Sequence, residues 1–294
     1  MKKKRSSWIY LVLGIMLFSL ITVSALPLVG SVVNGQQFAK DPNSEVITLS
    51  QRELAILDAE ASGYQKVLER EPNNDTALNG LLKIRLQQKD IAGAIAPLAK
   101  LAKLHPEQTE YSTLLAQAKQ QIKDYEGAAA VYKEVLAEHP GDIYALGGIT
   151  NLYLIQELPE RAIALLKKTI ESAERADSPK TVAINKESVE LLLGELYTNQ
   201  ERYGEAIALY DELAQLDQTD FRPILAKALV LEKKGDLNAA KPILQEAYIA
   251  APEEYKDQIG NEMERVVKSI KATEKAEASS STQTQSTKQI EIQQ

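Results

Sequence analysis

The hydrophobic positions along the chain follow a helical period, and the pattern recurs at a fixed interval. Residues 191–213, LLLGELYTNQERYGEAIALYDEL, show two amphipathic helical stretches joined by a polar turn. A proline follows such a stretch at Pro72, Pro106 and Pro140, which are 34 residues apart, and again at Pro252. Ten additional residues between Pro140 and Pro252 leave the later stretches in phase with this period. The pattern predicts a series of helix pairs, each 34 residues long.

Small residues recur where the two helices of a pair would cross. Each predicted second helix keeps an alanine at one position, followed four residues later on the same face by a bulky residue. The alanines are Ala94, Ala128, Ala162, Ala206 and Ala240. The bulky residues are Leu98, Tyr132, Leu166, Tyr210 and Leu244. Because small residues let two helices approach, we expect close helix crossings at these positions.

This pattern resembles the tetratricopeptide repeat (TPR) family. The family's residues are best kept at Leu193, Gly194, Tyr197, Ala206 and Tyr210. In other repeats, the family's glycine position holds Leu82, Ala116, Thr150 or Ala228, and the first repeat lacks a convincing first helix. The resemblance implies an all-α, TPR-like α-solenoid in which antiparallel helix pairs form a right-handed superhelix. We place the repeat array at residues 45–254.

The first forty residues have a different composition. Residues 1–7 carry four basic side chains, and an uncharged, mostly apolar run of 26 residues follows over 8–33. As a helix this run would be ~39 Å long, more than a bilayer core requires. We predict a basic cytoplasmic start, a transmembrane signal anchor over 8–33 and a linker over 34–44. The alternative is a signal peptide cleaved near Ala25. Either reading keeps the N-terminus cytoplasmic and places the repeats in a periplasm or a thylakoid lumen.

The segments after and within the array give further expectations. Residues 255–272 have an apolar stripe that suits a capping helix for the last repeat. Residues 273–294 are rich in Ser, Thr and Gln and poor in apolar residues, so we expect a disordered tail. The additional residues lie near 175–186. They either form a loop that contacts a partner or extend two helices, and the sequence does not decide between these.

The composition favours neither an enzyme nor a cofactor protein. The chain has no Cys, which excludes disulfides, thiolate zinc sites and a Cys nucleophile. It also lacks a P-loop, a GxGxxG and an HExxH motif. His105 and His139 each precede a repeat-ending proline, and a helix-end role explains them better than a metal site. We therefore predict no catalytic residues, no cofactor and no metal.

The net charge of the repeats disfavours nucleic acid as a partner. Residues 41–272 contain 27 Lys and Arg against 38 Asp and Glu, a net charge of −11. The expected partners are other proteins or peptide segments, together with the lipid bilayer through residues 8–33.

In TPR proteins the first helix of each repeat lines a concave groove. The resemblance places in this groove the predicted protein-binding residues Asn79, Lys83, Gln117, Gln120, Tyr144, Asn151 and Leu154. It also places Leu191, Glu195 and Arg222 there. Some family members bind C-terminal carboxylates through a basic clamp. Lys83 and Arg222 are four repeats apart, so that clamp does not assemble here.

A basic start, one membrane segment and this order of repeats are similar to membrane-anchored TPR proteins of cyanobacteria and to chloroplast thylakoid-lumen relatives. EPNNDTALNGLLKIRLQQKD and DFRPILAKALVLEKKGD carry this likeness. It implies a scaffold or assembly factor in the biogenesis of photosynthetic membranes. Two other classes stay open: a periplasmic envelope adaptor and an enzyme, the latter disfavoured by the missing motifs.

Overall fold

The structure, a computed structural model, describes residues 51–175 and 179–291, and every regular element in these residues is an α-helix. The predicted all-α class is therefore confirmed. The predicted basic start (1–7), membrane anchor (8–33) and linker (34–44) lie outside the described residues. None of the helices that the structure describes combines the length and the apolar composition needed to cross a membrane.

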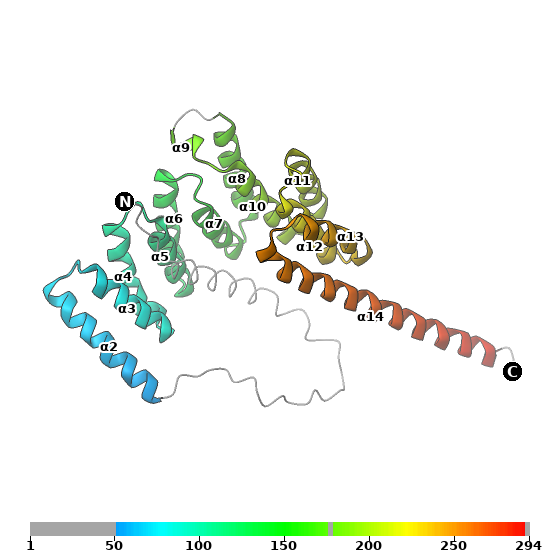
Figure 1. Cartoon of the computed structure of the whole chain (residues 1–294), viewed down its shortest axis with the longest axis horizontal. Coiled ribbons are helices and arrows are strands. Elements are labelled where there is room, and N and C mark those ends of the chain that lie inside the picture. The colour runs from blue at the N-terminus through cyan, green and yellow to red at the C-terminus, as the bar shows by residue number, and fades with distance from the viewer. Residues whose placement is uncertain (1–50, 176–178, 292–294) are drawn as a thin grey trace. The chain divides into compact units, whose positions relative to one another are not determined.

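The chain divides into two compact units, Met1–Leu152 and Tyr153–Gln294. The helices of the first unit are α2 (Gln51–Arg70), α3 (Asp75–Gln87), α4 (Ile91–Leu104), α5 (Thr109–Gln121), α6 (Tyr125–Glu138) and most of α7 (Ile143–Ile155) (Figure 1). Those of the second are α8 (Pro159–Arg175), α9 (Pro179–Val182), α10 (Lys186–Asn199), α11 (Tyr203–Leu216), α12 (Phe221–Lys234), α13 (Leu237–Ala250) and α14 (Glu253–Glu291). Within each unit, helices that follow one another in the chain pack together, which is the TPR-like α-solenoid arrangement.

The helix boundaries repeat with the predicted period because the same capping chemistry recurs. The first helices α3, α5 and α7 begin 34 residues apart. Each second helix α4 and α6 begins after an aspartate whose Oδ1 accepts a hydrogen bond from a backbone N–H: Gly93 N at 2.8 Å for Asp90, and Gly127 N at 2.9 Å for Asp124. Such a cap stabilises a helix by about 1 kcal/mol. Pro106 and Pro140 lie two residues beyond the ends of α4 and α6.

The turn between the two helices of a pair contains a left-handed residue in every repeat where the structure describes this turn. The positive φ angles belong to Lys89 (58°), Lys123 (66°), Glu157 (58°), Glu201 (58°) and Gly235 (90°). Only the last of these is a glycine, the residue that adopts this conformation without a steric penalty. In four of the five turns the left-handed residue therefore carries a side chain, and that conformation has a steric cost.

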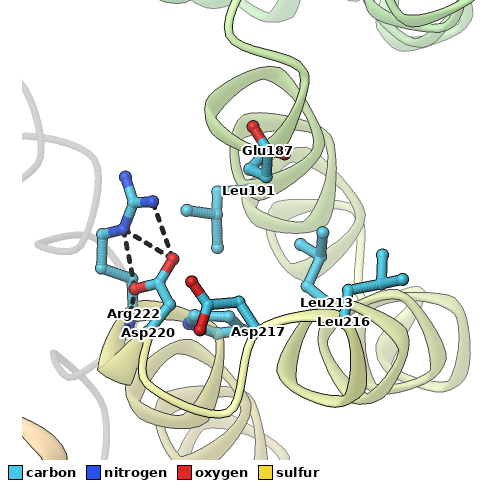
Figure 2. A pocket seen from close by; sticks show the side chains of 8 residues that line it. Glu187, Leu191, Leu213, Leu216, Asp217, Asp220 and Arg222 are labelled. Carbon is cyan, nitrogen blue, oxygen red and sulfur yellow. Dashed lines mark hydrogen bonds and ion pairs between the residues drawn. The ribbon is translucent and has the colours of Figure 1, made fainter. Parts of the chain in front are cut away.

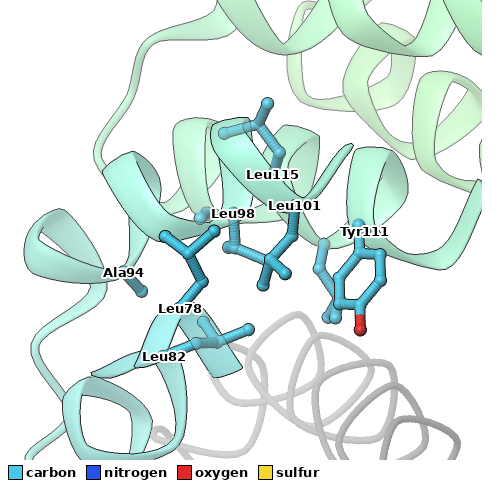
Figure 3. Packing of buried hydrophobic residues seen from close by; sticks show 9 residues of the cluster. Leu78, Leu82, Ala94, Leu98, Leu101, Tyr111 and Leu115 are labelled. Carbon is cyan, nitrogen blue, oxygen red and sulfur yellow. The ribbon is translucent and has the colours of Figure 1, made fainter. Parts of the chain in front are cut away.

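The core lies between neighbouring helices, as the α3, α4 and α5 cluster shows (Figure 3). Its fully or almost fully buried members are Leu78, Leu82, Ala94, Leu98, Leu101, Tyr111, Leu114, Leu115 and Ala118. Each fully buried leucine contributes roughly 1.5–3 kcal/mol. Because α4 packs on both its own first helix and the next one, one second helix holds two repeats together.

The size of the bulky residue on a second helix limits the size of the residue that packs against it on the next helix. A Cβ added at Gly80 would lie 2.4 Å from the Tyr64 ring, and one at Gly148 would lie 2.3 Å from the Tyr132 ring. Where the bulky residue is Leu98, the residue 16 positions later is Leu114 in the same cluster. The tyrosine thus requires a glycine opposite it, and the smaller leucine leaves space for another leucine.

Gly194 also leaves space for a tyrosine ring, but here the two residues belong to the two helices of one pair. A Cβ at Gly194 would lie 2.4 Å from the ring of Tyr210, which follows on α11. Ala206, one turn before Tyr210, is completely buried. The predicted close crossing is therefore present at α10 and α11.

The C-terminal segment differs from the prediction. The sequence indicates a capping helix over 255–272 followed by a disordered tail over 273–294, whereas α14 runs without interruption from Glu253 to Glu291. Ile259 and Val266 of α14 are buried, so its first part does cover the last repeat. Glu262 stands where the equivalent residues of α10 and α12 are Gly194 and Ala228.

The ten additional residues both lengthen one helix and add a short one. α8 has 17 residues, whereas α4 and α11 have 14, and the four-residue helix α9 follows it. Lys186 at the start of α10 lies 2.8 Å from Glu174 of α8, from Nζ to Oε1. Of the two alternatives for 175–186, helix extension is therefore observed in part, because α8 is longer and α9 is added. A role of this segment in binding stays a prediction.

The first prediction tests the pairing of Tyr132 with Gly148. Gly148→Leu should lower the free energy of unfolding by about 1–3 kcal/mol, because the new side chain overlaps the ring. Adding Tyr132→Leu recreates the pair seen at Leu98 and Leu114, so the double variant should lose clearly less than the sum of the single losses. Urea unfolding of all three variants measures this.

The neighbouring glycine provides the control for that experiment. No described atom lies within 4 Å of a Cβ added at Gly147. Gly147→Leu should therefore be tolerated. Additive losses for Gly148→Leu and Tyr132→Leu would show that the two positions are not coupled.

The second prediction concerns the left-handed turn residues. Lys123→Gly should raise the free energy of unfolding by about 0.5–1 kcal/mol, since glycine removes the steric penalty at φ 66°. Lys133→Gly, inside α6, should lower it by a similar amount, and Gly235→Ala should lower it by about 1 kcal/mol. Thermal unfolding checks all three. Equal effects of Lys123→Gly and Lys133→Gly would contradict the turn assignment.

Candidate functional site

Two residues of the predicted groove are part of the packing between repeats. Gln117 is 2% exposed and Gln120 is 7% exposed, so neither is open to a partner. The amide Nε2 of Gln120 donates to Oδ1 of Asn151 on α7 over 2.9 Å. This bond joins the first helices α5 and α7, so part of the predicted groove face of α5 contacts the next repeat. Both predicted groove residues are thus buried in this structure, and their role in binding stays a prediction.

The other predicted residues are more accessible, although several already have a hydrogen-bond partner. Asn79 is half-buried; its Oδ1 accepts from the Tyr111 hydroxyl at 3.1 Å and its Nδ2 donates to the carbonyl of Asp75 at 2.9 Å. Burial raises the pKa of Tyr111 despite this hydrogen bond. Lys83 is exposed and Tyr144 is 36% exposed. Their role in binding stays a prediction.

Leu154 is half-buried and belongs to the second unit, whereas the other six predicted residues belong to the first. Each unit therefore has to be considered as a binding surface by itself.

Polar contacts of this kind join successive repeats. In the first unit, His105 Nε2 lies 2.5 Å from Asp75 Oδ1, and the Thr109 hydroxyl donates to Asp142 Oδ2 over 2.5 Å. In the second, Lys233 Nζ donates to Asn199 Oδ1 over 3.0 Å. These bonds fix the distance between neighbouring repeats.

His105 and His139 are the C-caps of α4 and α6, which agrees with the predicted helix-end role. Within 51–175 and 179–291, no group of three or more His, Asp or Glu side chains is arranged to hold a metal ion.

The second unit contains a cavity of about 290 Å³ where the N-terminal ends of α10 and α12 meet the C-terminal end of α11 (Figure 2). Its lining residues are Glu187, Leu191, Leu213, Leu216, Asp217, Asp220, Arg222 and Pro223. Leu213 is buried and fixed in the core, whereas Leu216 is 71% exposed. The lining of the cavity is therefore mixed, with four apolar and four charged side chains.

The charged groups of the cavity are held in defined positions. Arg222 Nη2 lies 2.7 Å from Asp220 Oδ2, and its Nε lies 2.9 Å from Oδ1 (Figure 2). Burial by itself would raise the pKa of Asp220, but the hydrogen bonds from Arg222 outweigh it and hold that pKa below its ordinary value. The same pair raises the pKa of Arg222. Both groups are therefore charged at neutral pH.

Asp217 is held by the turn between α11 and α12. Its Oδ1 accepts from the Thr219 hydroxyl at 2.7 Å and from the Thr219 backbone N–H at 2.8 Å. These two hydrogen bonds lower the pKa of Asp217, so its carboxylate is ionised at neutral pH. The turn thereby fixes a negative charge at the cavity.

The sequence reasoning found only part of this cavity. The resemblance placed Leu191 and Arg222 on the first-helix face, but Leu213, Leu216 and Asp217 belong to a second helix and the turn after it. One signal was present in the sequence. The repeat that ends here has Gln218 where the others have Pro72, Pro106, Pro140 and Pro252.

Comparison with known proteins gives the class of the chain. Two models described as tetratricopeptide repeat match residues 122–178 and 191–223. Together with the 34-residue helix pairs, these matches identify the helix pairs within 122–178 and 191–223 as tetratricopeptide repeats. The architecture indicates a scaffold for protein–protein interaction.

Individual relatives are more distant. Cellulose synthase operon protein C of Pseudomonas fluorescens (strain SBW25) is 34% identical over 88 residues, which are 30% of this chain and 7% of that protein. Yeast Tom70 has a TM-score of 0.49 at 14% identity, over 88% of this chain and 47% of that one. A tetratricopeptide repeat protein from Parabacteroides merdae ATCC 43184 has a TM-score of 0.46 at 17% identity, over 75% of this chain and 87% of that one. The chain thus spans less than half of Tom70 and a small part of the Pseudomonas protein.

The third prediction separates packing residues from accessible ones. Gln120→Ala should lower the free energy of unfolding by about 1–2 kcal/mol, because it leaves the Asn151 amide without its partner. Lys83→Ala, at an exposed position of a first helix, should change it by less than about 0.5 kcal/mol. Chemical unfolding of the two variants provides the test. An equally small effect for both would mean that Gln120 is not part of the interface between repeats.

Proposed function

We propose that this protein is a scaffold that binds an extended segment of a partner protein along the first helices of its repeats, and that the cavity of the second unit anchors one partner side chain. The cavity is the observation that carries the proposal. It combines apolar side chains with charged groups held in defined positions, the combination by which a pocket gains both affinity and specificity. Its volume is near the lower limit of about 300 Å³ for ligand pockets, which suits a single side chain.

The exposure of Leu216 supports an interaction at this site. A leucine that is 71% exposed next to buried Leu213 costs solubility and contributes little to packing. Contact with a partner would remove it from water. In many interfaces a few anchor residues in well-packed, desolvated pockets contribute most of the binding energy.

Membrane tethering is the second part of the proposal, and it rests on the sequence. The apolar residues 8–33 would hold the scaffold to a membrane, with the repeats on the periplasmic or thylakoid-lumen side. We propose a place in the assembly of photosynthetic membranes, because the basic start, the membrane segment and the order of repeats are similar to cyanobacterial and chloroplast TPR proteins.

A periplasmic envelope adaptor with a cleaved signal peptide is the alternative. The mass of the mature protein distinguishes the two: a chain that begins at Met1 carries the anchor, and one that begins near Leu26 has been cleaved.

The fourth prediction tests the anchor site with a matched pair of variants. Leu216 lines the cavity and is 71% exposed, and Ile249 is 73% exposed at the end of α13. Leu216→Ala should reduce the recovery of bound proteins several-fold, because it removes apolar contact in the cavity, whereas Ile249→Ala should not. The tagged full chain is purified from detergent-solubilised membranes, and the co-purified proteins are quantified by mass spectrometry.

Both variants should show the thermal unfolding of the unchanged protein, since neither side chain is buried. Equal recovery with Leu216→Ala and Ile249→Ala would remove the cavity as the anchor. The exposed first-helix residues Lys83 and Tyr144 would then be the next positions to change.

A further inference from the structure

The charges at the cavity of the second unit do not balance. Its lining contains three carboxylates, those of Glu187, Asp217 and Asp220, and one guanidinium, that of Arg222. Asp220 binds Arg222 through three contacts of 2.7–3.0 Å, so this pair is neutral as a whole. Among the described residues, neither Glu187 nor Asp217 forms an ion pair within 4.0 Å. Arg222 also interacts electrostatically with Glu187 and Asp217, but three carboxylates face one guanidinium, so the lining keeps an excess of two negative charges.

The hydrogen bonds of Asp217 leave one of its oxygens available. Both bonds from Thr219 go to Oδ1, so Oδ2 can accept from a ligand. Glu187 lies in the first turn of α10, on the opposite side of the cavity from the turn that holds Asp217 (Figure 2). A cation that enters between them would meet a carboxylate from each side.

The apolar part of the cavity limits what such a cation can be attached to. Leu191, Leu216 and Pro223 line the space between the carboxylates and the buried Leu213. A long aliphatic stem with a charged end can pack against these side chains and still place its charge among oxygens. Lysine and arginine are the two side chains built in this way.

We propose that this cavity receives a lysine or arginine side chain from the partner segment, with the aliphatic stem on the leucines and the cationic end at Glu187 and Asp217. The inference rests on the proposed function, since it specifies the chemistry of the anchor. An acidic side chain would be repelled by the two carboxylates, and Arg222 is already occupied by Asp220. An apolar side chain would remove water from the carboxylates without replacing it by any counter-charge.

The charge of the surrounding chain acts in the same direction. The excess of acidic residues over 41–272 attracts a basic segment from a distance and accelerates its encounter with the repeats. The cavity then provides a place where that attraction is combined with apolar contact.

The fifth prediction uses four peptide pools as the probe. Each pool has random residues on both sides of a central position that is lysine, arginine, norleucine or glutamate, and binding to the full chain in detergent is measured by fluorescence anisotropy. The lysine and arginine pools should bind about 3- to 10-fold more tightly than the norleucine pool, and the glutamate pool should bind most weakly. Norleucine keeps an aliphatic stem without the charge, so this comparison isolates the cationic end.

A pair of double variants locates the effect. Glu187→Gln with Asp217→Asn should bring the lysine pool to the level of the norleucine pool and leave norleucine binding unchanged. Glu212→Gln with Asp257→Asn removes the same charge from exposed positions that do not line the cavity, and it should keep most of the preference for lysine. If both double variants lose the preference equally, net charge explains it and the proposed pocket is overturned.

The remaining outcomes separate this inference from the proposed function. If the norleucine or glutamate pool binds the unchanged protein as well as the lysine pool, the cavity is an anchor of different chemistry and only the inference fails. If no pool binds more tightly to the unchanged protein than to Leu216→Ala, the cavity is not an anchor, and both fail.

Discussion

The close crossing of neighbouring helices is the constraint on which the rest of the structure depends. α4, for example, contacts both α3 and α5, so the volume of its central side chain affects the spacing on both sides. Tyr132 can occupy that position only because Gly148 has no side chain, and Leu98 can meet Leu114 because it is smaller. At these two crossings a large side chain is matched by a small one, or two side chains of intermediate size meet.

Periodicity was sufficient to predict the helix pairs, because burial and capping act within one repeat and recur in the next. The pairing of Tyr64 with Gly80 was missed because it joins two repeats, and a pattern aligned on single repeats does not reveal it. The C-terminal segment differs for another reason. Its polar composition indicated disorder over 273–294, whereas α14 extends to Glu291.

The binding surface was the least predictable feature, since the same helix face serves cohesion and recognition. Gln117 and Gln120 look like groove residues in the sequence, yet they are buried between repeats. Whether a polar side chain on this face meets its neighbour or a ligand depends on the packing of successive first helices, which one sequence does not fix. The cavity lies at the repeat end that has Gln218 in place of proline. This departure from the repeat pattern therefore indicated the position of the cavity better than the repeated residues did.

Glu262 has a consequence for the number of repeats. It occupies the α14 position at which α10 and α12 have Gly194 and Ala228, and its carboxylate is paired with Arg265. A further second helix packed there would have to cover an ion pair in place of a small apolar side chain, at a large desolvation cost. This position of α14 is therefore a poor surface for packing a further helix. An engineer who wished to append repeats would have to replace Glu262 before adding the next helix.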